Sequence, residues 1–299
     1  MRSSSVHGPC PGGSRRAFLL GAAACLAPIA ARAASPLEGA REKIAAIEAR
    51  EGGRLGVAIL DTSAGARLGY RDDERFPMCS TFKLLAAAAV LKRVDDGAER
   101  LDREIAYTAA DLLDYAPIAK AHATEGRMSV ADLCAAAIDW SDNTAGNLIL
   151  QSIGGPAGFT RFARSLGDSA TRLDRIESEL NASIPGDERD TTSPRAMLSD
   201  MQAVLTGNAL SEASRRQLES WLADDKVGDK RLRAGLPPSW RVGDKTGSGD
   251  NGSTNCLAIL RPPGRAPLLA AVYFTGSTAS TDARNAVHKE IGALIAETF

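Results

Sequence analysis

A serine and a lysine three positions apart stand at the start of an apolar stretch and could act together. Ser80 and Lys83 precede the Leu- and Ala-rich segment 84–91, which contains no Gly or Pro and predicts a buried helix. Ser80 is a favourable residue to begin that helix, which would place Lys83 on the same face, one turn on. A hydroxyl beside an amine is a nucleophile beside a base. On this stretch alone, a helix-capping serine with a lysine that reaches solvent is the simpler interpretation.

Three further polar segments could contribute chemistry. Ser-Asp-Asn at 141–143 follows a predicted helix, although a simple turn between helices explains it as well. Segment 175–190 is long, polar and without periodicity, which is typical of an Ω loop. Lys-Thr-Gly-Ser-Gly at 245–249 follows a strand, where glycines let another backbone or a ligand approach the strand edge. A phosphate-binding loop is excluded there because the Gly-Lys pair is missing.

Taken in order, Ser-x-x-Lys, Ser-Asp-Asn and Lys-Thr-Gly resemble the signature of class A β-lactamases and penicillin-binding proteins. The match covers essentially the whole chain after residue 33. The resemblance implies a metal-free serine β-lactamase without a cofactor, which hydrolyses penicillins and, we expect, cephalosporins through an acyl-enzyme. A DD-peptidase or penicillin-binding protein and a β-lactam-binding sensor domain are the alternatives. Glu177 with Asn181 is similar to the deacylating loop of class A enzymes and favours the hydrolase.

The resemblance also implies catalytic roles for the matched residues. Ser80 would attack the lactam carbonyl, and either Lys83 or Glu177 would take its proton, a choice that the sequence leaves open. Ser141 would relay a proton towards the lactam nitrogen. Glu177 would then activate the water that releases the product, with Asn181 positioning that water. The oxyanion hole would be formed by the backbone N–H groups of residues 80 and 248.

Substrate binding and loop structure are implied in the same way. The arginine often found on the strand after Lys-Thr-Gly is absent, and Arg231 resembles a substitute that some family members use; a surface arginine is the alternative. Ile176-Glu177-Ser178 stands where many members have Trp-Glu-Pro, which leaves the geometry of the peptide after Glu177 open. We expect a structural pair between Arg175 and Asp190 across the neck of the loop. The expected substrate-binding residues are Asn143, Asn181, Lys245, Thr246, Gly247, Ser248, Arg231 and Tyr115.

The order of predicted elements indicates an α+β fold. Strands at the two ends of the chain are best joined in one antiparallel five-stranded sheet flanked by the terminal helices. We expect residues 34–71 and 224–299 to form this α/β lobe and residues 72–223 to form an all-helical lobe, with the active site in the cleft between them. The expected strands are 54–61, 66–71, 240–243, 255–261 and 267–275; the expected helices are 36–50, 80–97, 129–138, 144–153, 156–165, 193–206, 211–222 and 280–297.

The first 33 residues predict a signal peptide of twin-arginine type. Arg15-Arg16 precedes a short apolar run, and Ala31-Arg32-Ala33 supplies small residues for cleavage. We therefore expect a periplasmic protein without a stable membrane anchor, because the run is too short to span a bilayer. With 36 basic and 37 acidic residues, the charge balance speaks against nucleic-acid binding, and we expect a monomer acting on a small molecule.

Cysteine and histidine usage speaks against a zinc hydrolase. After the signal peptide only His122 and His288 remain, far apart and without metal-ligand spacing. Cys79, Cys134 and Cys256 are also irregularly spaced, so we expect three buried thiols, with one disulfide pair still conceivable.

Overall fold

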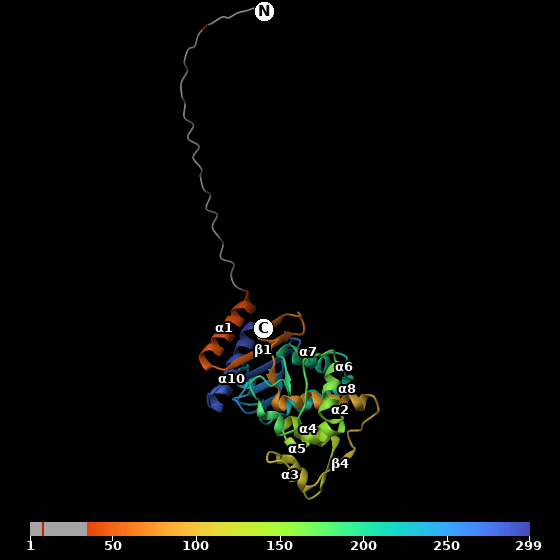
Figure 1. The fold of residues 1–299 in the computed structure, drawn as a ribbon. Helices are drawn as coiled ribbons and strands as arrows, with labels where there is room; N and C mark the ends of the chain where they lie inside the picture. Colours follow the sequence, from red (N-terminus) through yellow and green to blue (C-terminus); the bar gives the residue numbers. More distant parts are fainter. Residues whose placement is uncertain (1–7, 9–34) are drawn as a thin grey trace, which may run out of the picture. The chain divides into compact units, whose positions relative to one another are not determined.

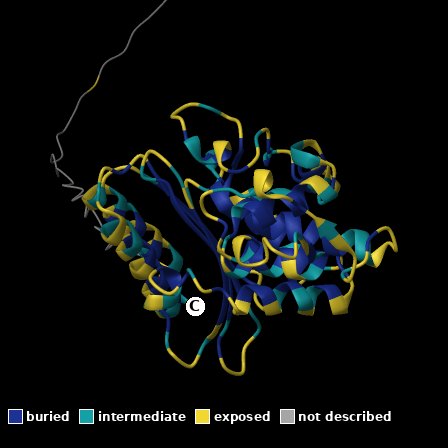
Figure 2. Cartoon of the chain, turned by 90° about the horizontal axis from the view of Figure 1, so that it is seen from below, coloured by how far each residue is buried: buried dark blue, intermediate teal, exposed yellow. Residues whose placement is uncertain are grey.

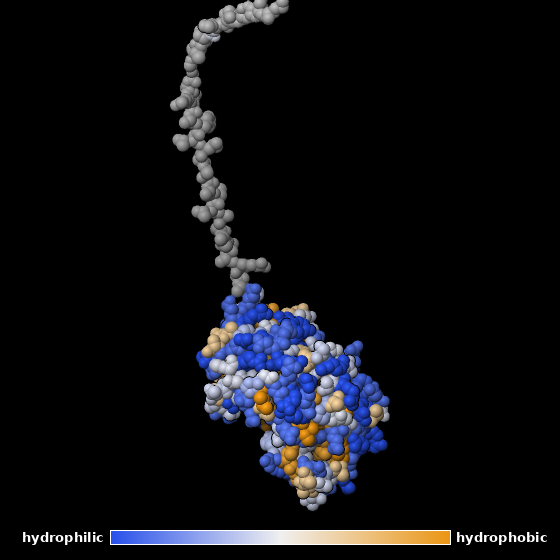
Figure 3. Space-filling model, in the orientation of Figure 1, coloured by the Kyte–Doolittle hydropathy of each residue, from blue (hydrophilic) through white to orange (hydrophobic). Residues whose placement is uncertain are grey.

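The computed structural model describes Gly8 and residues 35–299, and the predicted signal peptide, apart from Gly8, lies outside the described residues (Figure 1). The described residues 35–299 belong to one compact unit. Within the described part of the chain, no helix combines the length and apolar character needed to cross a membrane. The face of these residues seen in Figure 3 is largely hydrophilic.

A five-stranded antiparallel sheet runs through this unit, as the sequence predicts. Its strand order is β2-β1-β9-β8-β7, so the first and last parts of the chain share one sheet. β1 is paired with β9 along its whole length, from Arg54 opposite Thr275 to Asp61 opposite Leu268. The strands are β1 (Arg54–Asp61), β2 (Arg67–Tyr70), β7 (Arg241–Ser248), β8 (Thr254–Arg261) and β9 (Leu268–Thr275).

Both faces of the sheet are buried, which explains why its strands are almost continuously apolar (Figure 2). Successive side chains of a strand point to opposite faces. In β1, Val57 and Ile59 accordingly pack with the terminal helices α1 (Pro36–Glu51) and α10 (Thr281–Thr298). Ala58 and Leu60 belong to the second apolar cluster, which continues into the remaining helices. The sheet thus separates two hydrophobic cores; the predicted lobe boundaries near residues 72 and 224 stay a prediction.

The second core surrounds one central helix. α2 (Phe82–Asp95) is buried without interruption from Phe82 to Leu91, because other helices cover it on several sides (Figure 1). Serine, aspartate or proline residues begin most of these helices. They are α3 (Pro117–Ala121), α4 (Val130–Asp139), α5 (Asn143–Ser152), α6 (Gly155–Ser165), α7 (Pro194–Leu205) and α8 (Glu212–Ala223). The short helix α9 (Leu232–Gly235) packs instead against α10 in the first core.

Several details differ from the sequence prediction. β7 continues past residue 243 to Ser248, and the short helices α3 and α9 were not expected. Two short antiparallel ladders, β3 (Phe76–Pro77) with β6 (Thr191–Thr192) and β4 (Glu104–Ala106) with β5 (Arg127–Ser129), were not expected, since strands of two or three residues leave no periodic pattern. The predicted helix start at Ser80 is wrong: residues 79–81 form a 3₁₀ helix, η1, and α2 begins at Phe82. The two remaining 3₁₀ helices of the described residues are η2 (Ala109–Asp111) and η3 (Glu179–Ala182).

Candidate active site

The hydroxyl of Ser80 does not cap a helix; it is engaged by an amine and a carboxylate. Ser80 Oγ donates to Glu177 Oε1 at 2.9 Å and accepts from Lys83 Nζ at 3.1 Å. The residue before it, Cys79, has a φ of 47°, a left-handed conformation that costs a non-glycine residue about 1 kcal/mol or more. This turn directly precedes Ser80, and the Ser80 side chain lines a cleft.

Lys83 is completely buried and does not reach solvent. Its Nζ donates to the carbonyl of Ser141 at 2.8 Å and to Asn143 Oδ1 at 2.7 Å, and it lies 2.9 Å from Glu177 Oε1. Burial lowers the pKa of this amine, and the charge of Glu177 opposes that shift. A lysine with a lowered pKa that touches a hydroxyl is suited to exchange a proton with it.

A glycine on α5 makes room for this lysine. A Cβ atom added to Gly146 would lie 2.6 Å from Lys83 Cε, far inside van der Waals contact. The absence of a side chain at this position therefore allows α5 to pass close to α2 with the amine between them. Gly146 carries no recognisable motif, and the sequence analysis did not single it out.

The carboxylate of Glu177 reaches Ser80 from the Ω loop. Asn181 Nδ2 donates to Glu177 Oε2 at 2.5 Å, while Oε1 faces Ser80 and Lys83. The peptide bond between Glu177 and Ser178 is cis. Both carboxylate oxygens of Glu177 thus have a polar contact, although the residue is buried.

Asn147 holds the backbone of Glu177, and sequence reasoning missed it. The Glu177 N–H donates to Asn147 Oδ1 at 2.9 Å, and Asn147 Nδ2 donates to the Glu177 carbonyl at 2.9 Å. Asn147 lies on α5, one helical turn after Asn143 and therefore on the same face. That spacing from the Ser-Asp-Asn motif is the one signal in the sequence that could have identified it.

The neck of the Ω loop is fastened by a buried aspartate. Arg175 Nε donates to Asp190 Oδ2 at 2.5 Å. Asp190 Oδ1 accepts from the backbone N–H groups of Asp174 at 2.7 Å and Arg175 at 2.9 Å. A charged acceptor with three donors makes strong hydrogen bonds, so both ends of the loop are fixed to one side chain.

The opposite wall of the cleft comes from β7, which brings a second buried amine. Lys245 Nζ donates to Ser141 Oγ at 3.0 Å and to the carbonyl of Thr246 at 3.0 Å. Burial, together with the charge of Lys83, lowers the pKa of Lys245 to about 7. Ser141 has a φ of 56°, and this strained turn directs its hydroxyl towards Lys245 while its carbonyl faces Lys83.

β7 can approach η1 only because glycine stands at two positions. A Cβ atom at Gly247 would lie 2.9 Å from the carbonyl oxygen of Met78, and one at Gly249 would lie 2.7 Å from Cys79 Sγ. These contacts place the end of β7, with Ser248, next to the turn that carries Ser80. The glycines of the Lys-Thr-Gly-Ser-Gly motif thus allow a close approach of two backbone segments.

Arg231 is almost fully buried beside β7 and β8, with 7% of its surface exposed. Its guanidinium donates to Ser248 Oγ at 2.6 Å and to two strand carbonyls, those of Gly247 at 2.9 Å and Asn255 at 2.6 Å. Nε donates to Asn285 Oδ1 on α10 at 3.1 Å. A surface location for this arginine, the alternative in the sequence analysis, is wrong.

These side chains meet at a cleft of about 290 Å³. Lys83, Glu177 and Lys245 are buried behind its surface. Tyr115 lies at its edge with 48% of its surface exposed. Val227, which also lines it, has no polar group or motif and was not predicted. The lining residues are Ser80, Tyr115, Ser141, Asn143, Asn181, Val227, Arg231, Thr246, Gly247 and Ser248.

The described residues contain no group of three or more His, Cys, Asp or Glu side chains placed to hold a metal ion. Cys79, Cys134 and Cys256 are free and buried, so no disulfide joins them. Burial raises the pKa of the Cys79 thiol to about 12. A neutral thiol of this kind is a poor nucleophile or metal ligand.

Comparison with known proteins agrees with this geometry. A family model described as the beta-lactamase enzyme family matches residues 39–299. An ancestral class A β-lactamase is 59% identical, with 87% of this chain and 100% of the other covered and a TM-score of 0.86. PenP from Rhodopseudomonas palustris, provisionally assigned to class A β-lactamases, is 54% identical, with coverage of 87% and 100% and a TM-score of 0.86. The chain therefore belongs to the β-lactamase enzyme family and is a class A enzyme that hydrolyses β-lactams.

Proposed function

We propose that this enzyme opens the β-lactam ring by forming an acyl-enzyme on Ser80, which a water activated by Glu177 then releases. One observation carries the proposal: Ser80 Oγ, Lys83 Nζ and Glu177 Oε1 are in mutual contact, with separations of 2.9, 3.1 and 2.9 Å. A hydroxyl in contact with two proton acceptors in a water-poor site is an activated nucleophile.

Acylation requires that Ser80 loses its proton as Oγ bonds to the lactam carbonyl carbon. Both the Glu177 carboxylate and the Lys83 amine lie within reach of that proton, so two acceptors are available. When the C–N bond breaks, the nitrogen takes a proton from the Ser141 hydroxyl, which Lys245 replenishes from 3.0 Å away. The backbone N–H groups of Ser80 and Ser248 stabilise the oxyanion.

Deacylation requires a water beside Glu177. Asn181 Nδ2 is used by Glu177 Oε2, while Asn181 Oδ1 is buried and lacks a hydrogen-bond partner among the described residues. A buried acceptor without a partner is costly, and a water held between this oxygen and the Glu177 carboxylate would satisfy it. Glu177 then takes a proton from this water as it attacks the ester. Asn147 acts as a positioning residue through the backbone of Glu177.

Substrate recognition follows from the polar groups that line the cleft. Arg231, with Thr246 and Ser248, would bind the carboxylate that penicillins and cephalosporins share, because its guanidinium is the permanent charge at that wall. Asn143 would hold the substrate's side-chain amide. Gly247 lines the wall formed by β7, and Lys245, buried behind that wall, would support substrate binding through Ser141. Tyr115 would pack on the substrate at the mouth of the cleft.

The cellular context is part of the proposal. Residues 1–33 would direct export by the twin-arginine route, and the mature enzyme would act in the periplasm as a monomer on a small-molecule substrate, without nucleic acid or a stable membrane anchor. An enzyme in that compartment would protect its host against β-lactam antibiotics before they reach their targets. Residues 34–71 with 224–299, and residues 72–223, would form the two lobes on either side of the cleft.

The experiment is hydrolysis of a chromogenic cephalosporin by the mature protein and by Ser80→Ala. We expect rapid turnover by the wild type and a loss of about 10³-fold or more in the variant, since removing a nucleophile abolishes the covalent route. Ser63→Ala, at an exposed turn away from the cleft, serves as the matched serine control and should retain full activity. Undiminished turnover by Ser80→Ala would refute the proposed nucleophile.

A further inference from the structure

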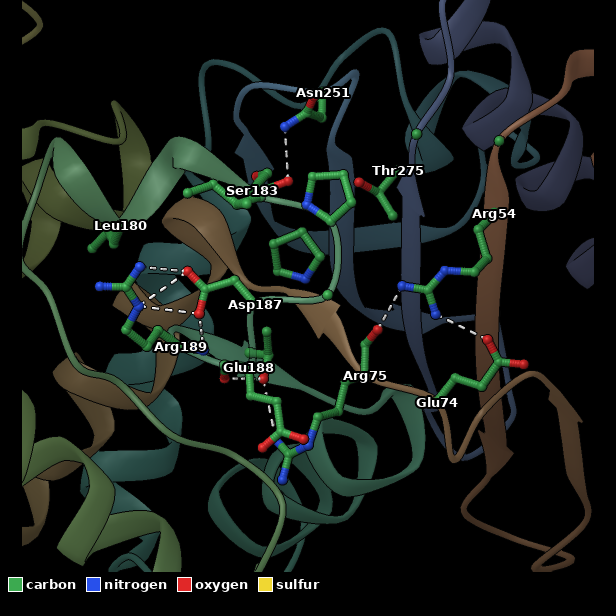
Figure 4. A pocket seen from close by; sticks show the side chains of 17 residues that line it. Arg54, Glu74, Arg75, Leu180, Ser183, Asp187, Glu188, Arg189, Asn251 and Thr275 are labelled. Carbon is green, nitrogen blue, oxygen red and sulfur yellow. Dashed lines mark hydrogen bonds and ion pairs between the residues drawn. The ribbon is translucent and has the colours of Figure 1, made fainter.

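A second cavity lies beneath the Ω loop, on the side of η3 that faces away from the cleft. It has a volume of about 550 Å³, within the range of small-molecule sites. Its walls come from loop residues 183–189, from β3 and from the adjoining ends of β1 and β9 (Figure 4). No residue lines both this cavity and the cleft that contains Ser80.

Two adjacent residues of η3 line the cavity and the cleft, one each. Leu180 lines the cavity, whereas Asn181 lines the cleft and donates to Glu177 Oε2. The short 3₁₀ helix η3 therefore forms part of the wall between them. This arrangement makes the cavity a separate site that is in physical contact with the catalytic loop.

Two charged groups of the cavity are not used in ion pairs. Arg54 pairs with Glu74 at 2.9 Å and Arg189 pairs with Asp187 at 2.7 Å; these pairs lie on opposite sides of the cavity in Figure 4. Arg75 and Glu188 appear between them, and neither forms an ion pair within residues 35–299.

Hydrogen bonds fix the Arg75 guanidinium but do not use all of its N–H donors. Its Nη1 donates to the carbonyl of Ala170 at 2.7 Å and to Thr191 Oγ1 at 3.1 Å, which leaves Nε and Nη2 without a partner among the described residues. A fixed guanidinium with free donors is suited to bind a carboxylate. Glu188, an acceptor of opposite charge, lines the same cavity.

The rest of the lining combines the polar residues Ser183, Thr191, Asn251 and Thr275 with an apolar part. Pro77, Leu180, Ile184 and Pro185 contribute their side chains, and Ile184 has 49% of its surface exposed, which is unusual for a large aliphatic residue beside a cavity. Among residues 35–299, the cavity thus offers apolar side chains together with one cation and one anion that form no ion pair.

We propose that this cavity binds a short zwitterionic peptide with apolar side chains. The peptide's carboxylate contacts Arg75, its ammonium contacts Glu188, and its side chains cover Ile184, Pro185 and Pro77. A purely anionic ligand fits less well because Glu188 would repel it, and a neutral one leaves both free charges without partners. A dipeptide is small enough for the volume, and larger peptides would extend past the exposed Ile184.

The test is calorimetric titration of the dipeptide phenylalanyl-leucine into the mature enzyme, together with its N-acetylated and its C-amidated forms. We expect the free dipeptide to bind, and each blocked form to bind about fivefold more weakly because it loses one partly exposed ion pair. The wild-type comparison needs no variant, so it is independent of any effect of substitution on folding.

Variants then assign the contacts. In Glu188→Gln, acetylation should no longer weaken binding, and in Arg75→Gln, amidation should no longer weaken it. Glu212→Gln and Arg216→Gln, which form an exposed pair on α8 outside the cavity, are the matched charge controls and should behave as wild type. Failure of the free dipeptide to bind at about 5 mM, or equal losses in all variants, would overturn the proposal.

The site is also expected to influence catalysis, a step that rests on the proposed role of Glu177. Because Leu180 and Asn181 are neighbours, a bound peptide should change the deacylation rate of a penicillin by about twofold or more. Binding without such a change would refute the coupling and leave the peptide site standing. If deacylation by the wild type without peptide did not depend on Glu177, that result would instead refute the proposed function.

Discussion

The substitution Gly146→Ala tests how closely α5 must approach the buried lysine. The added methyl group would lie 2.6 Å from Lys83 Cε, whereas carbon atoms in contact are about 3.5–4.0 Å apart. Lys83 must therefore move by about 1 Å. Its Nζ makes contacts of 2.7 to 3.1 Å with Ser80, Ser141, Asn143 and Glu177, and a shift of this size would break the hydrogen-bond geometry of several of them.

The expected effect of Gly146→Ala on the reaction rate is larger than its expected effect on the free energy of unfolding. A misplacement of about 1 Å in a catalytic group costs about 100-fold in rate, or about 2.7 kcal/mol in activation free energy. The free energy of unfolding should change less, because alanine gains about 1 kcal/mol in helix propensity and overpacking costs about 1–3 kcal/mol. We therefore expect Gly146→Ala to be folded, with at most a few degrees lost in Tm, and nearly inactive.

The assay is kcat/KM for a penicillin, measured beside a thermal unfolding curve for each protein. Gly39→Ala on α1 is the matched control, because a Cβ atom there meets nothing within 4 Å. The control should keep full kcat/KM. A value for Gly146→Ala within about threefold of wild type would refute the reasoning that the position of Lys83 depends on this glycine.

Three further substitutions test separate parts of the site and fold. Asn147→Ala should lower kcat about 10- to 100-fold through slower deacylation, because Glu177 loses two backbone hydrogen bonds; an unchanged deacylation rate in single-turnover kinetics would contradict this. Arg231→Gln should lower kcat/KM about 10-fold or more for a penicillin but not for its methyl ester, and equal losses for both would argue against carboxylate recognition. Asp200 faces the Asp168 carboxyl, and burial, followed by that neighbouring charge, raises its pKa to about 9. The folded state then keeps a proton that the unfolded state releases above about pH 3.9, so this group's contribution to stability falls as pH rises towards about 9, by at most about 1.4 kcal/mol per pH unit. Asp200→Asn should remove this fall in urea titrations across the pH range, and an unaltered pH dependence would contradict it.

The sheet could be predicted from sequence because both of its faces are buried. Long apolar runs such as those of β8 and β9 are unambiguous at eight residues. β7 was predicted only to residue 243, although it continues to Ser248. Its continuation contains Lys245 and Gly247, two residue types that disfavour strands. The close approach to η1 accounts for Gly247, and the contact with Ser141 accounts for Lys245.

The candidate site could be located from motifs, but the contacts that arrange it could not. Local capping rules led to the wrong expectation that Ser80 begins a helix, and its partners Lys83 and Glu177, the latter 97 residues away in the chain, were implied only by the family resemblance. Asn147 and Gly146 were overlooked for the same reason. An asparagine and a glycine within a helix have no function visible in the sequence until the packing of α5 against the Ω loop and α2 is known.

The most direct test of the account is intact-mass analysis of Glu177→Gln after brief exposure to a penicillin. The variant keeps the size of the side chain and removes its ability to accept the proton of a water. We expect the full mass of the penicillin to remain on the variant for minutes or longer, mapped by peptide digestion to Ser80, while the wild type is unmodified under the same conditions because it turns over. A Glu177→Gln protein that hydrolyses penicillin as fast as wild type, with no adduct, would contradict the account.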